Sequence, residues 1–170
     1  MIGFRHGSLE VAWLLVLTAA LGCAGGSAGL ASAPLRLTDL DASGDAARRA
    51  SLRLCISGLD AAAEGRRSAA LGQYERAIQI DPTNPYAYLV LARDEVESGD
   101  PELALLYLDQ AQTLLEAEGL LTPGAEAHLA GLRGVALIAT GRDGGAQLRE
   151  ARRLAPSIWQ DGRLDAAELR

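Results

Sequence analysis

The sequence predicts an all-α protein built from consecutive pairs of helices, and three observations support this fold class. Hydrophobic residues make up 49% of the 170 positions but aromatic residues only 4%, which favours helices packed closely through Ala and Leu. Prolines behind capping residues mark helix starts, and glycines mark helix ends. The chain also matches itself at an offset of 34 residues.

The first 45 residues are predicted to export and tether the protein rather than to join its folded core. Residues 1–22 carry Arg5 and then an apolar run of 11 residues. A membrane span needs about 20 such residues, so the run is typical of a secretory signal peptide. Residues 23–45 begin with Gly, Ala and Ser and show no sustained periodicity. That composition predicts a flexible tether.

The apolar run ends in ALGC, residues 20–23, which resembles the lipobox of bacterial lipoprotein signal peptides. The resemblance implies cleavage after Gly22 and acylation of Cys23. The protein would then be lipid-anchored in the bacterial cell envelope, facing the periplasm, with the outer membrane as the expected location. The alternative is ordinary signal cleavage near AGGSAG, residues 24–29, which would leave an exported protein without lipid.

Helix ends can be predicted from capping chemistry alone. An Asn, Asp or Thr followed by Pro combines an N-cap side chain with a residue whose missing N–H is not needed at the first helical position. Glycine just after a helix readily takes the left-handed conformation that ends it. The starts are Asn84-Pro85, Asp100-Pro101 and Thr122-Pro123, and the stops are Gly99, Gly119 and Gly141. Three starts and three stops agree with one helix-turn-helix scheme.

The offset of 34 residues places residues of similar size on one another. Gly65 falls on Gly99, and the pairs Ala70 with Ala104 and Ala77 with Ala111 also coincide. This pattern resembles the tetratricopeptide repeat, which has a turn glycine and alanines where its helices cross. The clearest stretch is YERAIQIDPTNPYAY, residues 74–88. A generic helical bundle is the alternative.

The resemblance implies a right-handed α-α superhelix of about three helix pairs over residues 46–156. The three repeats would span about residues 51–84, 85–118 and 123–156. In the third, Gly141 to Ala151 spans 10 residues where Gly65 to Ala77 spans 12, so its second helix or turn should be altered. Residues 157–170 are expected to form a short capping helix that uses Trp159, Leu164 and Leu169.

In this family the first helices of successive repeats line a concave groove that holds a peptide or a partner helix. Transferring those positions predicts a partner-binding groove made of Leu52, Cys55, Leu59, Tyr86, Leu89, Arg93 and Glu97, together with Leu129 and Arg133 from the third repeat. Tyr86 and Arg93 are two helical turns apart and belong to residue types that often dominate interfaces. The alternative is that Tyr86 packs on the preceding helix and Arg93 is solvated.

No catalytic residues, metal site or cofactor are expected. His128 is the one histidine beyond the signal, and the sequence has no Cys-x-x-Cys motif or glycine-rich phosphate loop. Residues 39–50 match part of a calcium-binding loop, but Ala50 stands where a bidentate Glu belongs. Ser43 or Asp45 is instead expected to cap the first helix.

The net charge of −6 argues against nucleic acid as a partner, because a phosphate backbone attracts basic surfaces. The sequence therefore predicts an envelope-anchored repeat lipoprotein that is not an enzyme. It would act as a protein-protein interaction scaffold or assembly factor, resembling pilotin-type and outer-membrane-complex lipoproteins in architecture. Its partners would be a protein or peptide in the groove and the membrane through the lipid. The alternative is an exported, unlipidated module with a structural or self-associating role.

Overall fold

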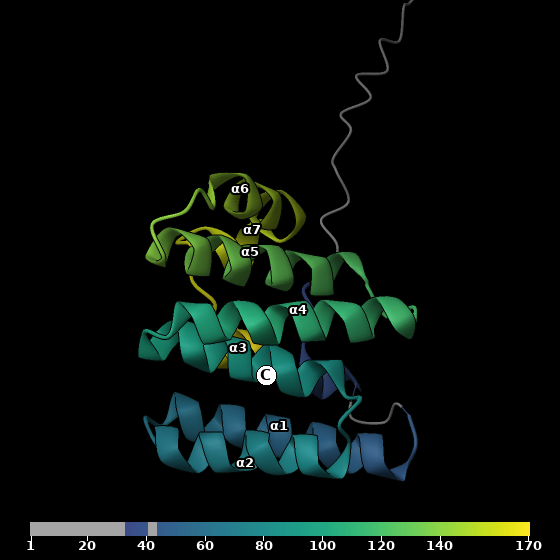
Figure 1. Cartoon of the computed structure of the whole chain (residues 1–170). Helices are drawn as coiled ribbons and strands as arrows, with labels where there is room; N and C mark the ends of the chain where they lie inside the picture. Colours follow the sequence, from purple (N-terminus) through teal and green to yellow (C-terminus); the bar gives the residue numbers. More distant parts are fainter. Residues whose placement is uncertain (1–32, 41–43) are drawn as a thin grey trace, which may run out of the picture.

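The computed structural model describes residues 33–40 and 44–170, and within them it is all helical. The six longer helices form three consecutive antiparallel pairs (Figure 1), which are α1 (Ala46–Ala63) with α2 (Arg67–Ile80), α3 (Pro85–Ser98) with α4 (Pro101–Ala117), and α5 (Pro123–Ala139) with α6 (Gly145–Leu154). The short elements are the 3-10 helix η1 (Leu37–Leu40), α7 (Pro156–Trp159) and α8 (Ala166–Leu169). The most extensive contacts lie within the three pairs. The prediction of an all-α chain of helix pairs is confirmed.

The predicted caps are present at the helix ends. The side chains of Asn84, Asp100 and Thr122 accept hydrogen bonds from the backbone N–H groups of the first turns of α3, α4 and α5. Asp45 caps α1 in the same way, by accepting from the Arg48 N–H at 2.8 Å. The predicted stop glycines all have positive φ angles, namely 87° at Gly99, 66° at Gly119 and 77° at Gly141. Local chemistry therefore sets where these helices begin and end.

The abrupt connection between α2 and α3 is held by a buried polar network. The Asn84 side chain donates to Ser51 Oγ at 2.8 Å, and Ser51 donates to the Ala77 carbonyl at 2.8 Å. Ser51 and Asn84 are both fully buried. Because buried polar groups are costly without partners, this network ties α1 to the turn that ends the first pair.

Small residues fill the helix crossings, as the repeat pattern predicts. Ala77, Ala104 and Ala111 are fully buried. Gly58 of α1 lies directly under the ring of Tyr74 in α2, and a Cβ added at Gly58 would come under 3.0 Å from that ring. The helices of the first two pairs therefore approach one another where side chains are small.

We expect Ala104→Leu to lower the free energy of unfolding by about 1–3 kcal/mol, because the added atoms overpack a filled crossing. Urea denaturation followed by circular dichroism measures the change. Ala69→Leu in α2 is the matched control, since Ala69 is exposed and its replacement should change stability by less than about 0.5 kcal/mol. Equal midpoints for the two variants would contradict the close packing at Ala104.

The third pair differs from the first two. Helix α6 has 10 residues, whereas α2 has 14 and α4 has 17. Its N-terminal end packs on α5 backbone to backbone, because a Cβ added at Gly144 would come under 3.0 Å from the Gly134 carbonyl oxygen. Both the turn and the second helix of this pair are therefore altered.

The N-terminal segment differs from the flexible tether that the sequence predicts. In residues 33–40, Leu37 is fully buried and Leu35 and Leu40 are half-buried against the core. The Thr38 N–H donates to the Arg170 carbonyl at 2.8 Å. Apolar side chains that find a complementary surface gain more from burial than they lose in chain entropy. The predicted signal peptide, Cys23 and the remainder of residues 1–32 lie outside the described residues.

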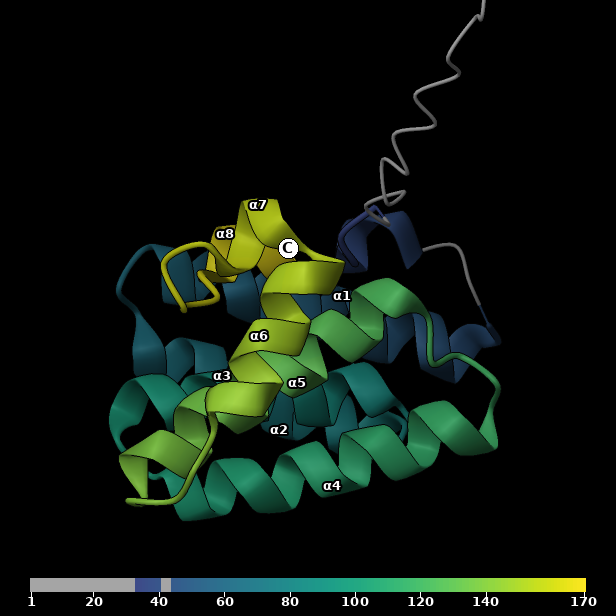
Figure 2. The same ribbon diagram turned by 90° about the horizontal axis from the view of Figure 1, so that it is seen from above.

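The C-terminal segment also differs in placement from the predicted cap. Trp159, Leu164 and Leu169 are buried as expected. They do not extend the stack beyond α6, however, because the chain turns back and α8 packs on α1 (Figure 2). Among the described residues, no helix is long and apolar enough to cross a membrane.

Candidate partner-binding face

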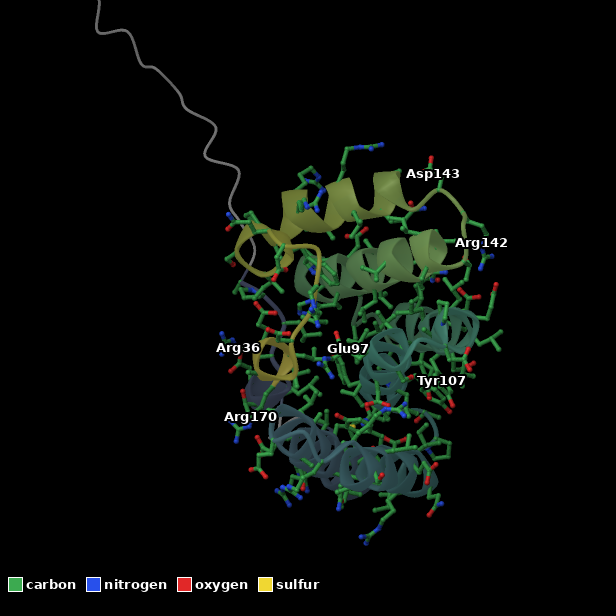
Figure 3. All side chains as sticks on the ribbon, turned by 90° about the vertical axis from the view of Figure 1, so that its left-hand side faces the viewer. Arg36, Glu97, Tyr107, Arg142, Asp143 and Arg170 are labelled. Atoms are coloured by element: carbon green, nitrogen blue, oxygen red, sulfur yellow. The ribbon has the colours of Figure 1, made fainter. Side chains whose placement is uncertain are left out.

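The first helices of successive pairs contact each other, α1 with α3 and α3 with α5, and together they form one side of the stack, which we call the first-helix face. Both terminal segments lie on it, since η1 and α8 each pack on α1. In a side view Arg36 and Arg170, which belong to these segments, lie on one side of the molecule, and Tyr107 and Arg142 lie on the opposite side (Figure 3). The predicted groove is thus partly filled by the chain itself.

Most of the apolar groove residues belong to the core. Leu52, Leu59 and Leu89 are fully buried, and Tyr86 is almost so. The prediction that they face a partner is not met in this conformation, because the terminal segments and neighbouring helices cover them. Tyr86 is 5% exposed and lies beside Leu52 of α1.

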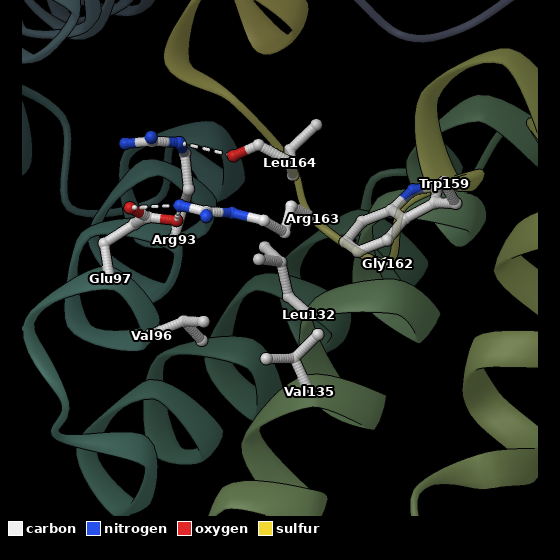
Figure 4. Close-up of a pocket in the computed structure, with 9 residues that line it drawn as sticks. All are labelled: Arg93, Val96, Glu97, Leu132, Val135, Trp159, Gly162, Arg163 and Leu164. Atoms are coloured by element: carbon white, nitrogen blue, oxygen red, sulfur yellow. Dashed lines mark hydrogen bonds and ion pairs between the residues drawn. The ribbon is translucent and has the colours of Figure 1, made fainter.

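Two predicted residues of α3 face the C-terminal segment (Figure 4). Arg93 is only 7% exposed, and its Nε donates to the Leu164 carbonyl at 2.8 Å. Glu97 is exposed and accepts from the Arg163 guanidinium at 3.3 Å. The alternative, in which Arg93 is solvated, is therefore wrong. The side chains of Arg93 and Glu97 both contact residues near the end of the chain.

Arg133 lies on a different side of α5. Its guanidinium donates to Asp109 Oδ1 at 2.6 Å and to Gln112 Oε1 at 3.0 Å, and both acceptors belong to α4. Arg133 thus joins the second and third pairs and does not line the first-helix face. The position transferred from the family pattern therefore differs from the place of Arg133 in the structure.

A cavity of about 230 Å³ remains on the first-helix face beside the C-terminal segment. Its lining combines an apolar floor from α3, α5 and α7 with a charged rim, and comprises Arg93, Val96, Glu97, Leu132, Val135, Trp159, Gly162, Arg163 and Leu164 (Figure 4). The sequence did not predict five of these lining residues, namely Val96, Leu132, Val135, Gly162 and Arg163. A signal for the C-terminal part of this lining was the spacing of Trp159, Leu164 and Leu169, but that spacing predicts a cap on the end of the stack.

Arg93 borders this cavity and a second one that also has a volume of about 230 Å³. The nearby carboxylates are already paired, since Arg67 binds Asp94 at 2.7 Å and Arg163 binds Glu97. Within residues 33–40 and 44–170, no carboxylate forms an ion pair with Arg93. The guanidinium is therefore held by a main-chain carbonyl alone.

A third cavity of about 280 Å³ lies toward the start of α1, where Leu52 and Tyr86 contribute to its lining. On its rim Arg48 donates to both carboxylate oxygens of Glu118, at 2.8 and 2.9 Å. These hydrogen bonds lower the pKa of the Glu118 carboxyl. Leu40 and Gly44 also contribute to its lining.

His128 connects the N-terminal segment to α5. Its ring is buried, and Nε2 lies 3.0 Å from the Leu35 carbonyl oxygen, so this nitrogen carries the proton and donates. Burial lowers the pKa of His128 to about 4. Its Nδ1 and the Nε1 of Trp159 have no hydrogen-bond partner among the described residues, and the two rings lie 6.3 Å apart.

Stability should fall as the pH drops from 6.5 toward 4, because the unfolded His128 takes up a proton near pH 6.5 and the folded one only near 4. The full difference between the two pKa values corresponds to about 3 kcal/mol of unfolding free energy, at about 1.36 kcal/mol per unit of pKa. Thermal melting between pH 7 and 4 follows most of this loss, and His128→Gln should flatten the profile. A profile that is unchanged by the substitution would assign the acid sensitivity to the carboxylates.

No reactive group stands out on this face. Cys55 is a fully buried free thiol, and burial raises its pKa to about 12. Within the described part of the chain, no group of three or more His, Cys, Asp and Glu side chains could hold a metal ion. The features that remain are two cavities around Arg93 and a face that already holds segments of the chain.

Comparison of the chain with protein-family models, with curated proteins and with solved structures gives no match. The class of protein is therefore defined by its architecture, which is a stack of three antiparallel helix pairs with both terminal segments folded onto one face.

Proposed function

We propose that this chain is a protein-interaction scaffold of tetratricopeptide type, with its helix pairs wound as a right-handed superhelix. The observation that carries the proposal is that two segments of the chain itself, residues 33–40 and the C-terminal segment, pack on the first-helix face. It buries their apolar side chains and contacts their main chain, as in the hydrogen bond from Arg93 to the Leu164 carbonyl. Rigid helices that present such a face are typical of proteins that bind segments of other proteins.

We further propose that the scaffold is anchored in the bacterial cell envelope through acylated Cys23, faces the periplasm and sits at the outer membrane. The support is the lipobox-like ALGC after an apolar run that is too short to span a bilayer. In that location the protein would serve as an assembly factor for an envelope complex, as in pilotin-type lipoproteins.

Site-specific photo-crosslinking in cells of the source organism tests the scaffold. A crosslinking amino acid at Glu97, which is exposed beside the cavity, should capture a discrete protein. The same amino acid at Arg149, exposed on α6, is the matched control and should not capture it. Identical adducts from the two positions would place partner binding away from the first-helix face, and the absence of adducts from both would contradict the scaffold role in these cells.

Metabolic labelling with a fatty acid tests the anchor independently. The full chain should incorporate the label, and Cys23→Ser should abolish incorporation and leave unprocessed precursor. A chain that takes up no label and partitions as a soluble protein would favour the unlipidated, exported module.

A self-associating role is the second candidate, and two exposed apolar side chains favour it. Leu106 of α4 is 65% exposed and Ile138 of α5 is 52% exposed. Exposed apolar side chains can mark contacts between subunits. Analytical ultracentrifugation of the chain and of Leu106→Ser with Ile138→Ser would show a concentration-dependent dimer that the double change disrupts.

A further inference from the structure

The last eleven residues, 160–170, form a segment that we call the tail. It starts with a turn at residues 160–163 in which Gly162 has a φ of 81°, and it ends in the four-residue helix α8. Leu164, Ala166 and Leu169 are its buried residues. Leu164 and Leu169 are five residues apart, so the tail attaches through two large apolar anchors with a small residue between them.

The tail lies across the first-helix face as a bound peptide would. Its start lies next to Trp159, which packs on Gly131 of α5, and its middle contacts Arg93 of α3 through the Leu164 carbonyl. Its end packs on α1 through α8, where Arg170 also pairs with Asp60. The tail thus contacts α3 and α1, and Trp159 just before it contacts α5.

The polar contacts of the tail are weak or unspecific. The ion pair of Arg163 with Glu97 is long, at 3.3 Å, and its side chains are 64% and 35% exposed. Arg170 and Asp60 are also exposed to solvent, at 48% and 43%. Exposed ion pairs contribute little to stability. Arg93 contacts a main-chain carbonyl, which every peptide offers, so the apolar anchors alone distinguish the tail from another segment.

We propose that the first-helix face is a peptide-binding groove that the tail keeps closed, and that its partner is a protein segment with two large apolar side chains five residues apart. Such a segment would displace the tail, place its apolar side chains where Leu164 and Leu169 now lie, and offer a carbonyl to Arg93. This inference rests on the proposed function, since it names the partner class of the same face. Displacement requires that the partner bind the open face more tightly than the tail does.

A fluorescent peptide with the sequence of residues 160–170 tests the proposal by anisotropy. It should bind the variant Leu164→Asp with Leu169→Asp at least about tenfold more tightly than it binds the wild-type chain, because the tethered tail occupies the wild-type groove. A peptide that carries the same two Asp replacements is the matched control and should not bind. Arg93→Met in the opened variant should weaken peptide binding by about three- to tenfold, the loss of one charge-assisted hydrogen bond.

Hydrogen exchange of the wild-type chain supplies a readout that does not depend on a folded variant. Backbone amides of α8 should exchange at least about tenfold faster than those of α3, because the tail opens without global unfolding. Equal protection of α8 and α3 would overturn the proposal, as would a helical, cooperatively melting double variant that binds no peptide. If peptide binding succeeds while crosslinking from Glu97 captures nothing, the groove stands and only the cellular scaffold role fails.

Discussion

Replacing Trp159 with Ala should lower the free energy of unfolding by about 3–5 kcal/mol, the largest effect of any single change that we expect. The indole is fully buried and lies so close to α5 that a Cβ added at Gly131 would come under 3.0 Å from the ring. Removing it would enlarge the cavity of about 230 Å³ that it already borders. Urea denaturation followed by far-ultraviolet circular dichroism measures the loss.

Trp159→Phe is the matched control for this change. The Trp159 N–H has no hydrogen-bond partner among the described residues, so Phe removes ring volume without breaking a hydrogen bond. We expect Trp159→Phe to lower the free energy of unfolding by less than about 1.5 kcal/mol. If Ala and Phe destabilise equally, or if Ala costs less than about 1 kcal/mol, the packing of α7 on α5 is not what holds the end of the chain in place.

Gly144→Ala should lower the free energy of unfolding by about 3 kcal/mol, nearly as much as Trp159→Ala. The added methyl group would overlap the carbonyl oxygen of Gly134, which belongs to the backbone of α5 and cannot rotate away as a side chain could. Helices α5 and α6 would have to separate. Thermal and urea denaturation should both show the loss.

Gly72→Ala in α2 is the control for that substitution. Nothing lies within 4 Å of a Cβ added at Gly72, and the residue is inside a regular helix. Alanine there should stabilise the protein by up to about 1 kcal/mol, because glycine loses more backbone entropy on entering a helix. A Gly144→Ala variant as stable as Gly72→Ala would mean that α6 does not pack on α5 at backbone distance.

The positions of the helices could be predicted because the interactions that set them are local. Asn84, Asp100 and Thr122 cap helices whose first residues follow them directly in the chain. The alanines at the crossings, such as Ala104, could be predicted because both repeats carry a small residue at the equivalent position. These signals need no knowledge of which distant segments meet.

The candidate site could be predicted only in part. Of the residues that the family pattern places in the groove, Arg93 and Glu97 contact the C-terminal segment of the chain itself. The structure instead pairs Arg133 with Asp109 of α4, a contact between two helices that no spacing along one helix predicts. The family pattern also predicts that Tyr86 is free to contact a partner, whereas its side chain is buried. A repeat pattern indicates which way a side chain faces but not which other segment covers it.

By itself, then, the sequence determined the helix pairs, their ends and the small residues at their crossings, since these depend on hydrogen bonds and periodicity within a few neighbouring residues. Only the tertiary structure decided that residues 33–40 and the C-terminal segment occupy the first-helix face. The contacts that decide it join residues far apart in the chain, such as Arg93 with Leu164 and Thr38 with Arg170. Which apolar surface such a segment covers depends on the shape that the assembled helices present, and no local pattern encodes that shape.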